Sequence, residues 1–134
     1  MKIRTIINLL YKFKIFKRIV PTLLKVMVKF FYINEIKVVH NNLIFLLNPK
    51  NPIDREIYLK DKYEDDQITF LKKKIDENRI KIFIDIGAHM GFYSINLSKK
   101  KLDIYAFEPI VENFNQLKKN ILINKIYNIK AYNC

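Results

Sequence analysis

The only two glycines of the chain, Gly87 and Gly91, lie four residues apart, directly after a short apolar run. That run, residues 82–86, reads IFIDI and is typical of a strand buried on both faces of a parallel sheet. Glycine permits the positive φ of a sharp turn and the close approach of another group. We therefore expect a strand, a turn and a helix over residues 90–100.

The same alternation continues to the end of the sequence. Residues 104–107 form a second apolar run, and a helical pattern follows, with Pro109 in its first turn and Asn124 at its end. Residues 126–132 supply a third strand. The order β-α-β-α-β predicts a parallel sheet in the order 3-2-1, joined by right-handed crossovers. The predicted fold class is α/β, a Rossmann-like sheet that is incomplete, preceded by a helix and a hairpin.

Three segments are expected upstream of this unit. Residues 36–39 and 43–46 flank Asn41-Asn42, which predicts a hairpin with a tight turn. Residues 48–52 hold two prolines and are interpreted as a loop. A helix capped by Asp65 or Asp66 is expected next, ending at residues 76–78, and its apolar face consists of Ile68, Leu71 and Ile75. The predicted domains are residues 1–35, a basic helix; 36–53, hairpin and linker; and 54–134, the α/β part.

The net charge of +12 is concentrated at the N-terminus, where residues 1–33 hold eight basic side chains and no acidic one. Apolar residues recur there at steps of three and four, with Lys14, Arg18, Lys25 and Lys29 on the other face, which predicts an amphipathic helix that Pro21 kinks or splits. Such a helix packs on its own domain or an unseen partner, lies on an anionic membrane surface, or binds nucleic acid. Nucleic acid is the least expected of the three.

Two further features bear on the setting of the protein. No stretch of 18 residues in the basic segment is free of charge, so no membrane span is expected there. The single cysteine, Cys134, excludes a disulfide framework and favours a reducing, cytoplasmic location. The basic segment makes the inner face of a membrane a candidate docking surface.

The predicted turn has the chemistry of a nucleoside site. It lies at the carboxyl edge of the sheet, where ligands bind, and Glu108 ends the second strand, 21 residues after Gly87. A carboxylate there can accept hydrogen bonds from both hydroxyls of a ribose. The sequence has neither the G-x-G-x-x-G pattern of dinucleotide sites nor a P-loop. Its D-x-G-x-x-x-G pattern suits S-adenosylmethionine better than NAD.

Several blocks of the sequence resemble the FkbM family of methyltransferases. They are residues 83–94 (FIDIGAHMGFYS), 106–109 (AFEP), 112–114 (ENF) and 117–120 (LKKN), with Asp54-Arg55 and Tyr63-Glu64 upstream. The resemblance covers residues 54–134. It implies S-adenosylmethionine as cofactor and transfer of its methyl group to an oxygen, often on a sugar, glycan or glycolipid. Such sequences more often have Asn at position 89, where this chain has His.

The resemblance also implies roles for individual residues. Gly87, Ala88 and Gly91 would line the methionine and ribose part of the cofactor, and His89 would lie near its carboxylate. Asp85 would brace the turn, Glu108 would hold the ribose diol, and Tyr63 and Glu64 would lie at the cofactor's edge. Simpler readings stay open: Asp85 as a strand-end cap and Glu108 as a charge at a helix N-terminus. No catalytic base and no metal ligand can be assigned.

Proteins that resemble this family have four more strands after the third, and the fourth packs beside the first. We therefore expect the chain to be the N-terminal portion of a methyltransferase, inactive alone, with its first strand at an open sheet edge. The acceptor would be a small molecule or a glycan. The alternative is a basic protein associated with a membrane surface, whose Rossmann-like part only binds a nucleoside ligand.

Overall fold

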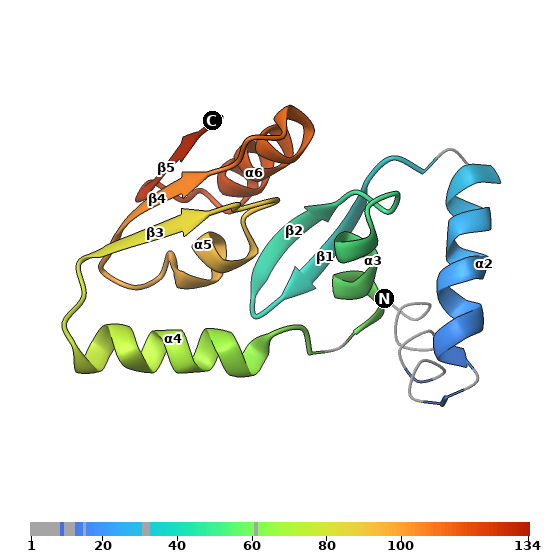
Figure 1. Ribbon diagram of the computed structural model, residues 1–134, viewed down its shortest axis with the longest axis horizontal. Coiled ribbons are helices and arrows are strands. Elements are labelled where there is room, and N and C mark those ends of the chain that lie inside the picture. The colour runs from blue at the N-terminus through green and yellow to red at the C-terminus, as the bar shows by residue number, and fades with distance from the viewer. Residues whose placement is uncertain (1–8, 10–12, 15, 31–32, 61) are drawn as a thin grey trace. The chain divides into compact units, whose positions relative to one another are not determined.

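The computed structural model describes residues 9, 13–14, 16–30, 33–60 and 62–134, which fall into two compact units. The first unit comprises the described residues of Met1–Val38 and Leu47–Tyr63, and the second comprises Val39–Leu46 and Glu64–Cys134. The elements are α2 (Phe16–Phe30), β1 (Ile36–His40), β2 (Leu43–Leu47), α3 (Pro52–Leu59), α4 (Asp65–Glu77), β3 (Ile82–Ile86), α5 (Phe92–Leu97), β4 (Asp103–Phe107), α6 (Val111–Ile123) and β5 (Ile129–Tyr132) (Figure 1).

The second unit contains a parallel sheet in the order β3-β4-β5. Ile84 of β3 is level with Tyr105 of β4, and Ile104 of β4 is level with Ile129 of β5. The predicted β-α-β-α-β order, the parallel pairing and the strand order are confirmed. Within the described part of the chain β3 is an edge strand, as the sequence predicted.

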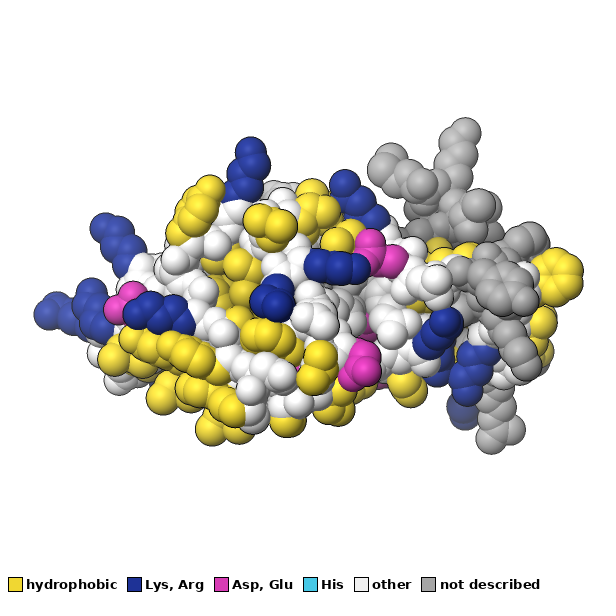
Figure 2. All heavy atoms as spheres, turned by 90° about the horizontal axis from the view of Figure 1, so that it is seen from above, with side chains coloured by type: hydrophobic (Ala, Val, Ile, Leu, Met, Phe, Trp, Pro, Cys, Tyr) yellow, Lys and Arg dark blue, Asp and Glu magenta, His cyan; other side chains and the backbone are white. Residues whose placement is uncertain are grey.

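The two faces of this sheet differ in burial. Ile104, Ala106 and Ile129 are buried on one face, whereas Ile82, Ile84 and Ile86 are 56%, 58% and 84% exposed on the other. The prediction that the first strand is buried on both faces is therefore wrong. Right-handed crossovers that run in the same direction place both connecting helices on one face, and no described element covers the opposite one. Figure 2 shows hydrophobic side chains lying at the surface beside lysines and arginines.

Strand β2 of the predicted hairpin is anchored to α6 by two asparagines. Asn41 and Asn42 have φ of 50° and 59°, so the tight turn is confirmed. Asn120 Oδ1 accepts a 2.7 Å bond from the Leu46 N–H, and Asn124 Oδ1 accepts a 2.8 Å bond from the Ile44 N–H. Four residues of a helix rise about 6 Å, close to the rise of about 6.6 Å over two strand residues. The helix therefore supplies polar partners for alternate residues of β2.

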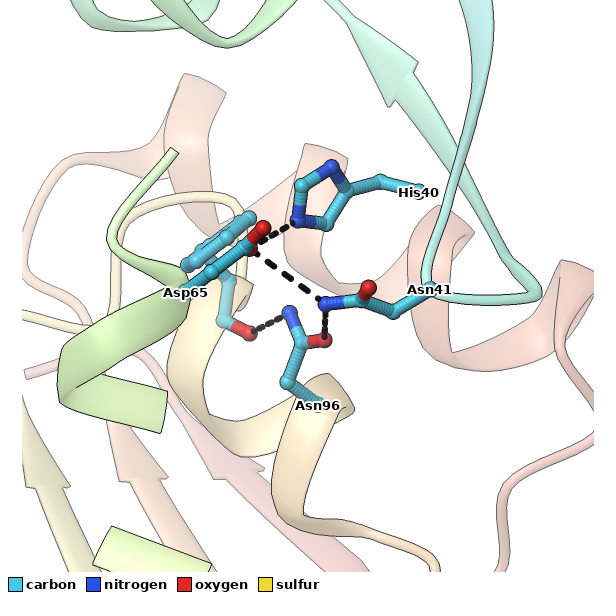
Figure 3. A network of polar contacts seen from close by, with 5 residues as sticks. His40, Asn41, Asp65 and Asn96 are labelled. Atoms are coloured by element: carbon cyan, nitrogen blue, oxygen red, sulfur yellow. Dashed lines mark hydrogen bonds and ion pairs between the residues drawn. The ribbon is translucent and has the colours of Figure 1, made fainter. Parts of the chain in front are cut away.

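A network of polar side chains joins the hairpin to α4 and α5 (Figure 3). His40 Nε2 lies 2.8 Å from Asp65 Oδ1, and His40 is buried. Asn41 donates a 3.4 Å bond to Asn96, whose own amide donates to the carbonyl of Phe92 at 2.8 Å. Asp65 thus contacts the hairpin rather than capping α4, and the prediction of an aspartate cap is wrong. The residue before α4, Glu64, has φ of 51° and makes no capping bond through its side chain.

The helices of the first unit differ in part from expectation. α2 continues through Pro21, so the proline does not split it, and the predicted start of this helix at residues 1–8 lies outside the described residues. Helix α3 was not predicted. Asn51 caps it by accepting a 2.9 Å bond from the Ile53 N–H, and Pro52 takes its first position.

The pair Asp54-Arg55, part of the family resemblance, holds the turn before α3. Asp54 Oδ2 accepts a 2.6 Å bond from the Asn48 N–H, and Arg55 donates to the carbonyls of Pro49 and Lys50 at 3.0 Å and 2.9 Å. Both side chains are buried. In the structure they therefore stabilise the segment that the sequence predicted as a loop.

Candidate functional site

The turn between β3 and α5 is fixed to the end of β4 through its backbone. The N–H groups of Gly87 and Ala88 both donate to the carbonyl of Phe107 at 2.9 Å. Gly87 has φ of 76°, and a Cβ placed on it would have no atom within 4 Å. The glycine is thus required by the backbone conformation, and its outer side is open.

Glu108 connects the two turns that follow β3 and β4. Its Oε2 accepts a 2.8 Å bond from the His89 N–H, and its Oε1 accepts bonds from the Ile110 N–H at 3.0 Å and from the Asn113 amide at 3.2 Å. The side chain is 3% exposed. An ionised carboxylate has about four acceptor positions, so one position, on Oε2, is left beside the turn. The predicted role of Glu108 toward a ribose stays a prediction.

Asp85 acts on the first turn of α5. Its Oδ2 accepts a 2.6 Å bond from the hydroxyl of Ser94 and a 3.2 Å bond from the Ser94 N–H. Burial raises the pKa of Asp85, the two bonds from Ser94 oppose that rise, and the nearby charge of Glu108 adds to it. Asp85 thus contacts the first turn of α5 through Ser94, and its predicted role at a cofactor stays a prediction.

Gly91 lies close to other side chains of the protein. Its φ is 89°, and a Cβ on it would collide with Cδ1 of Leu117 and lie 3.1 Å from Cδ1 of Ile95. The sequence left open whether a ligand or a neighbouring element lies there. In the structure the neighbours are side chains of α6 and α5.

The remaining predicted site residues are His89, Ala88, Tyr63 and Glu64. His89 is half-buried and has φ of 52°, a conformation that Asn and His adopt more readily than most residues. Ala88 is buried. Tyr63 belongs to the first unit, where the Lys60 ammonium lies 5.9 Å from its ring centroid, and Glu64 precedes α4 in the second unit. Their predicted positions at the edge of a cofactor stay predictions.

Three residues that the sequence did not single out support the turn. Ser94 holds Asp85, Asn113 holds Glu108, and Asn120 donates a 3.0 Å bond to the carbonyl of Met90. Ser94 and Asn120 are fully buried. The available signal was that Ser94, Asn113 and Asn120 lie in blocks 83–94, 112–114 and 117–120, on which the family resemblance rests.

The sheet with its turn has a Rossmann-like α/β fold, and 18 chains of solved structures match the chain. No model of a known protein family matches the sequence. A search of curated proteins found no match either.

The matched structures include the following three. A putative transferase, PH0793 of Pyrococcus horikoshii, is 19% identical with a TM-score of 0.52, and the match covers 75% of this chain and 36% of that one. TYW2 of M. jannaschii, in complex with AdoMet, is 21% identical with a TM-score of 0.52 and coverage of 75% and 43%. The tRNA (uracil-54, C5)-methyltransferase of Pyrococcus abyssi, in complex with S-adenosyl-L-homocysteine, is 17% identical with a TM-score of 0.50 and coverage of 75% and 24%. The chain thus spans less than half the length of each.

Proposed function

We propose that this chain forms the cofactor-binding part of an S-adenosylmethionine-dependent methyltransferase of the FkbM type, which modifies a hydroxyl group of a sugar, glycan or glycolipid. The observation that carries the cofactor assignment is the bond from the His89 N–H to Glu108 Oε2, which places a carboxylate beside the glycine turn. Structures with the same fold, described as complexes with AdoMet and S-adenosyl-L-homocysteine, support it.

The residues at the turn fit this cofactor. The open side of Gly87 leaves room beside the backbone, and the remaining acceptor position on Glu108 Oε2 suits a ribose hydroxyl. Ala88 and His89 would border the methionine part. When bound, S-adenosylmethionine supplies a methyl group on a positively charged sulfur. The contribution of these residues is to hold that group in a fixed orientation, on which such a transfer depends.

The acceptor class rests on the resemblance of residues 83–94 and 106–109 to the FkbM family. RNA is the competing acceptor, because matched structures include a tRNA methyltransferase. A version of the protein extended to the full methyltransferase fold can be incubated with labelled S-adenosylmethionine and either a glycan and glycolipid extract or total tRNA, since the chain alone is expected to be inactive. We expect label in the carbohydrate fraction. Label in tRNA would contradict the acceptor class, and label in neither would favour a part that only binds a nucleoside.

Calorimetry with S-adenosylhomocysteine tests the cofactor assignment directly. We expect Glu108→Ala to weaken binding about ten- to hundredfold, because a hydrogen bond to a charged group contributes about 1.5–3 kcal/mol. Glu112→Ala is the matched control, since Glu112 is an exposed glutamate in the first turn of α6. Its affinity should equal that of the unaltered chain.

A change in the ligand separates this contact from any effect on folding. The 2′-deoxy and 3′-deoxy forms of S-adenosylhomocysteine each lack one ribose hydroxyl. Because Glu108 has one acceptor position left, one form should bind more weakly to the unaltered chain than the other. Equal affinity of both forms and the parent compound would remove the ribose role of Glu108.

A further inference from the structure

Helix α2 exposes a row of large apolar side chains. Ile19, Leu23, Val26 and Met27 are 45%, 57%, 61% and 51% exposed. Their spacing of four, three and one residues places them on one face, because successive helical residues are rotated by about 100°. We call these four side chains the α2 apolar row.

The more buried side chains of α2 lie beside this row and do not belong to it. Val20 is 9% exposed and Leu24 is half-buried, and both lie on one flank of the row. The helix therefore packs through a separate flank. The α2 apolar row is left on the surface, where a contiguous group of large apolar side chains typically marks an interaction site.

The charge of the segment favours one kind of partner. Lys17 and Lys25 are exposed on other faces of α2 than the row, and no acidic residue occurs anywhere in residues 1–33. A helix with an apolar face and cations on its polar face complements a surface that is negatively charged outside and apolar within. No described helix is long and apolar enough to cross a membrane. At 15 residues, α2 is about 22 Å long, shorter than the hydrocarbon core of a bilayer, which is about 30 Å thick.

We propose that α2 docks on the surface of an anionic lipid bilayer, with the α2 apolar row inserted among the lipids and lysines such as Lys17 and Lys25 attracted to the headgroups. This binding does not depend on the proposed function, because the row and the cofactor turn belong to different units. It would hold the protein at a surface where lipid-linked acceptors are concentrated.

The test is sedimentation of the full chain with vesicles of phosphatidylcholine alone or with one third phosphatidylglycerol. We expect the anionic vesicles to bind at least tenfold more protein, and 0.5 M salt to abolish most of that difference. Leu23→Glu with Val26→Glu should lower binding at least tenfold. Phe70→Glu with Leu122→Glu is the matched control, because these residues are 58% and 78% exposed on α4 and α6 and the charge change is identical.

Three results would overturn the proposal. They are equal binding to neutral and anionic vesicles, equal loss in the row variant and its control, and tighter binding to RNA than to anionic vesicles. Calorimetry with S-adenosylhomocysteine on the row variant shows whether the other unit is intact. Failure of lipid binding and failure of cofactor binding are therefore distinguished.

Discussion

The backbone N–H of His89 lies 2.8 Å from Oε2 of Glu108, so the carboxylate at the end of β4 directly holds the turn that follows β3. The two residues are 19 positions apart, and the bond joins the two loops at the carboxyl edge of the sheet. Glu108 therefore has a structural task as well as the proposed ligand contact, and the two can be measured separately.

Glu108→Gln should lower the free energy of unfolding by about 1–3 kcal/mol. Gln has one carbonyl oxygen, so it cannot accept all three bonds that the carboxylate receives from His89, Ile110 and Asn113. Urea unfolding followed by circular dichroism measures the change. Glu112→Gln serves as the control, and equal stability of the two variants would show that the buried carboxylate does not hold the turn.

The two glycines should respond differently to alanine. Gly87→Ala should cost about 1–2 kcal/mol, since only the positive φ is penalised and the space around it is open. Gly91→Ala should cost more, because its Cβ also collides with Leu117. Thermal unfolding of both variants gives the comparison. Adding Leu117→Ala should remove the difference caused by the collision, and a Gly91→Ala variant no less stable than Gly87→Ala would contradict the packing.

Residue 89 should tolerate Asn but not Val. The backbone there has φ of 52°, which Asn adopts readily and a β-branched residue does not. His89→Asn should leave stability within about 0.5 kcal/mol, and His89→Val should lower it by about 1–3 kcal/mol. The same unfolding assay decides, and a stable Val variant would show that the left-handed turn is not required.

Stability should depend on pH through Asp85. Its pKa in the folded protein is raised above the ordinary value of 3.8, so the folded state favours the protonated form. The stability from this group is fully present below pH 3.8 and is lost as pH rises through the raised pKa. Asp85→Asn should remove this dependence. Unfolding in urea at several pH values tests it, with the exposed Asp103→Asn as control; parallel pH profiles for Asp85→Asn and the unaltered chain would refute it.

Asn120→Ala should loosen the hairpin on α6. The change leaves the Leu46 N–H and the Met90 carbonyl without their partner, at a cost of about 2–3 kcal/mol. Hydrogen exchange at the Leu46 amide should become faster. Asn115→Ala is the matched control, because Asn115 is exposed on the same helix. Unchanged exchange at Leu46 would show that the asparagine does not anchor the strand.

Much of the fold follows from local patterns. The turn at Asn41-Asn42, the three strands from residue 82 onward and the end of α6 at Asn124 depend on φ preferences and on periodicity that neighbouring residues share. The strand order then follows from the handedness of the crossovers. Helix α3 was missed although Asn51-Pro52 has the residue types of a helix start, because the prolines were interpreted as loop signals.

The sequence by itself determined the sheet, its strand order and the place of the glycine turn with a carboxylate at the end of the next strand. Only the tertiary structure decided that Asp65 contacts His40, that Gly91 faces Leu117 and that Asn120 holds Leu46. These partners lie 25 to 74 residues apart. The residues next to an asparagine in the sequence do not show whether its side-chain amide binds a distant backbone group or water. The tertiary structure also decided that one face of β3 is exposed, because the residues of a strand do not specify on which side the connecting helices pack.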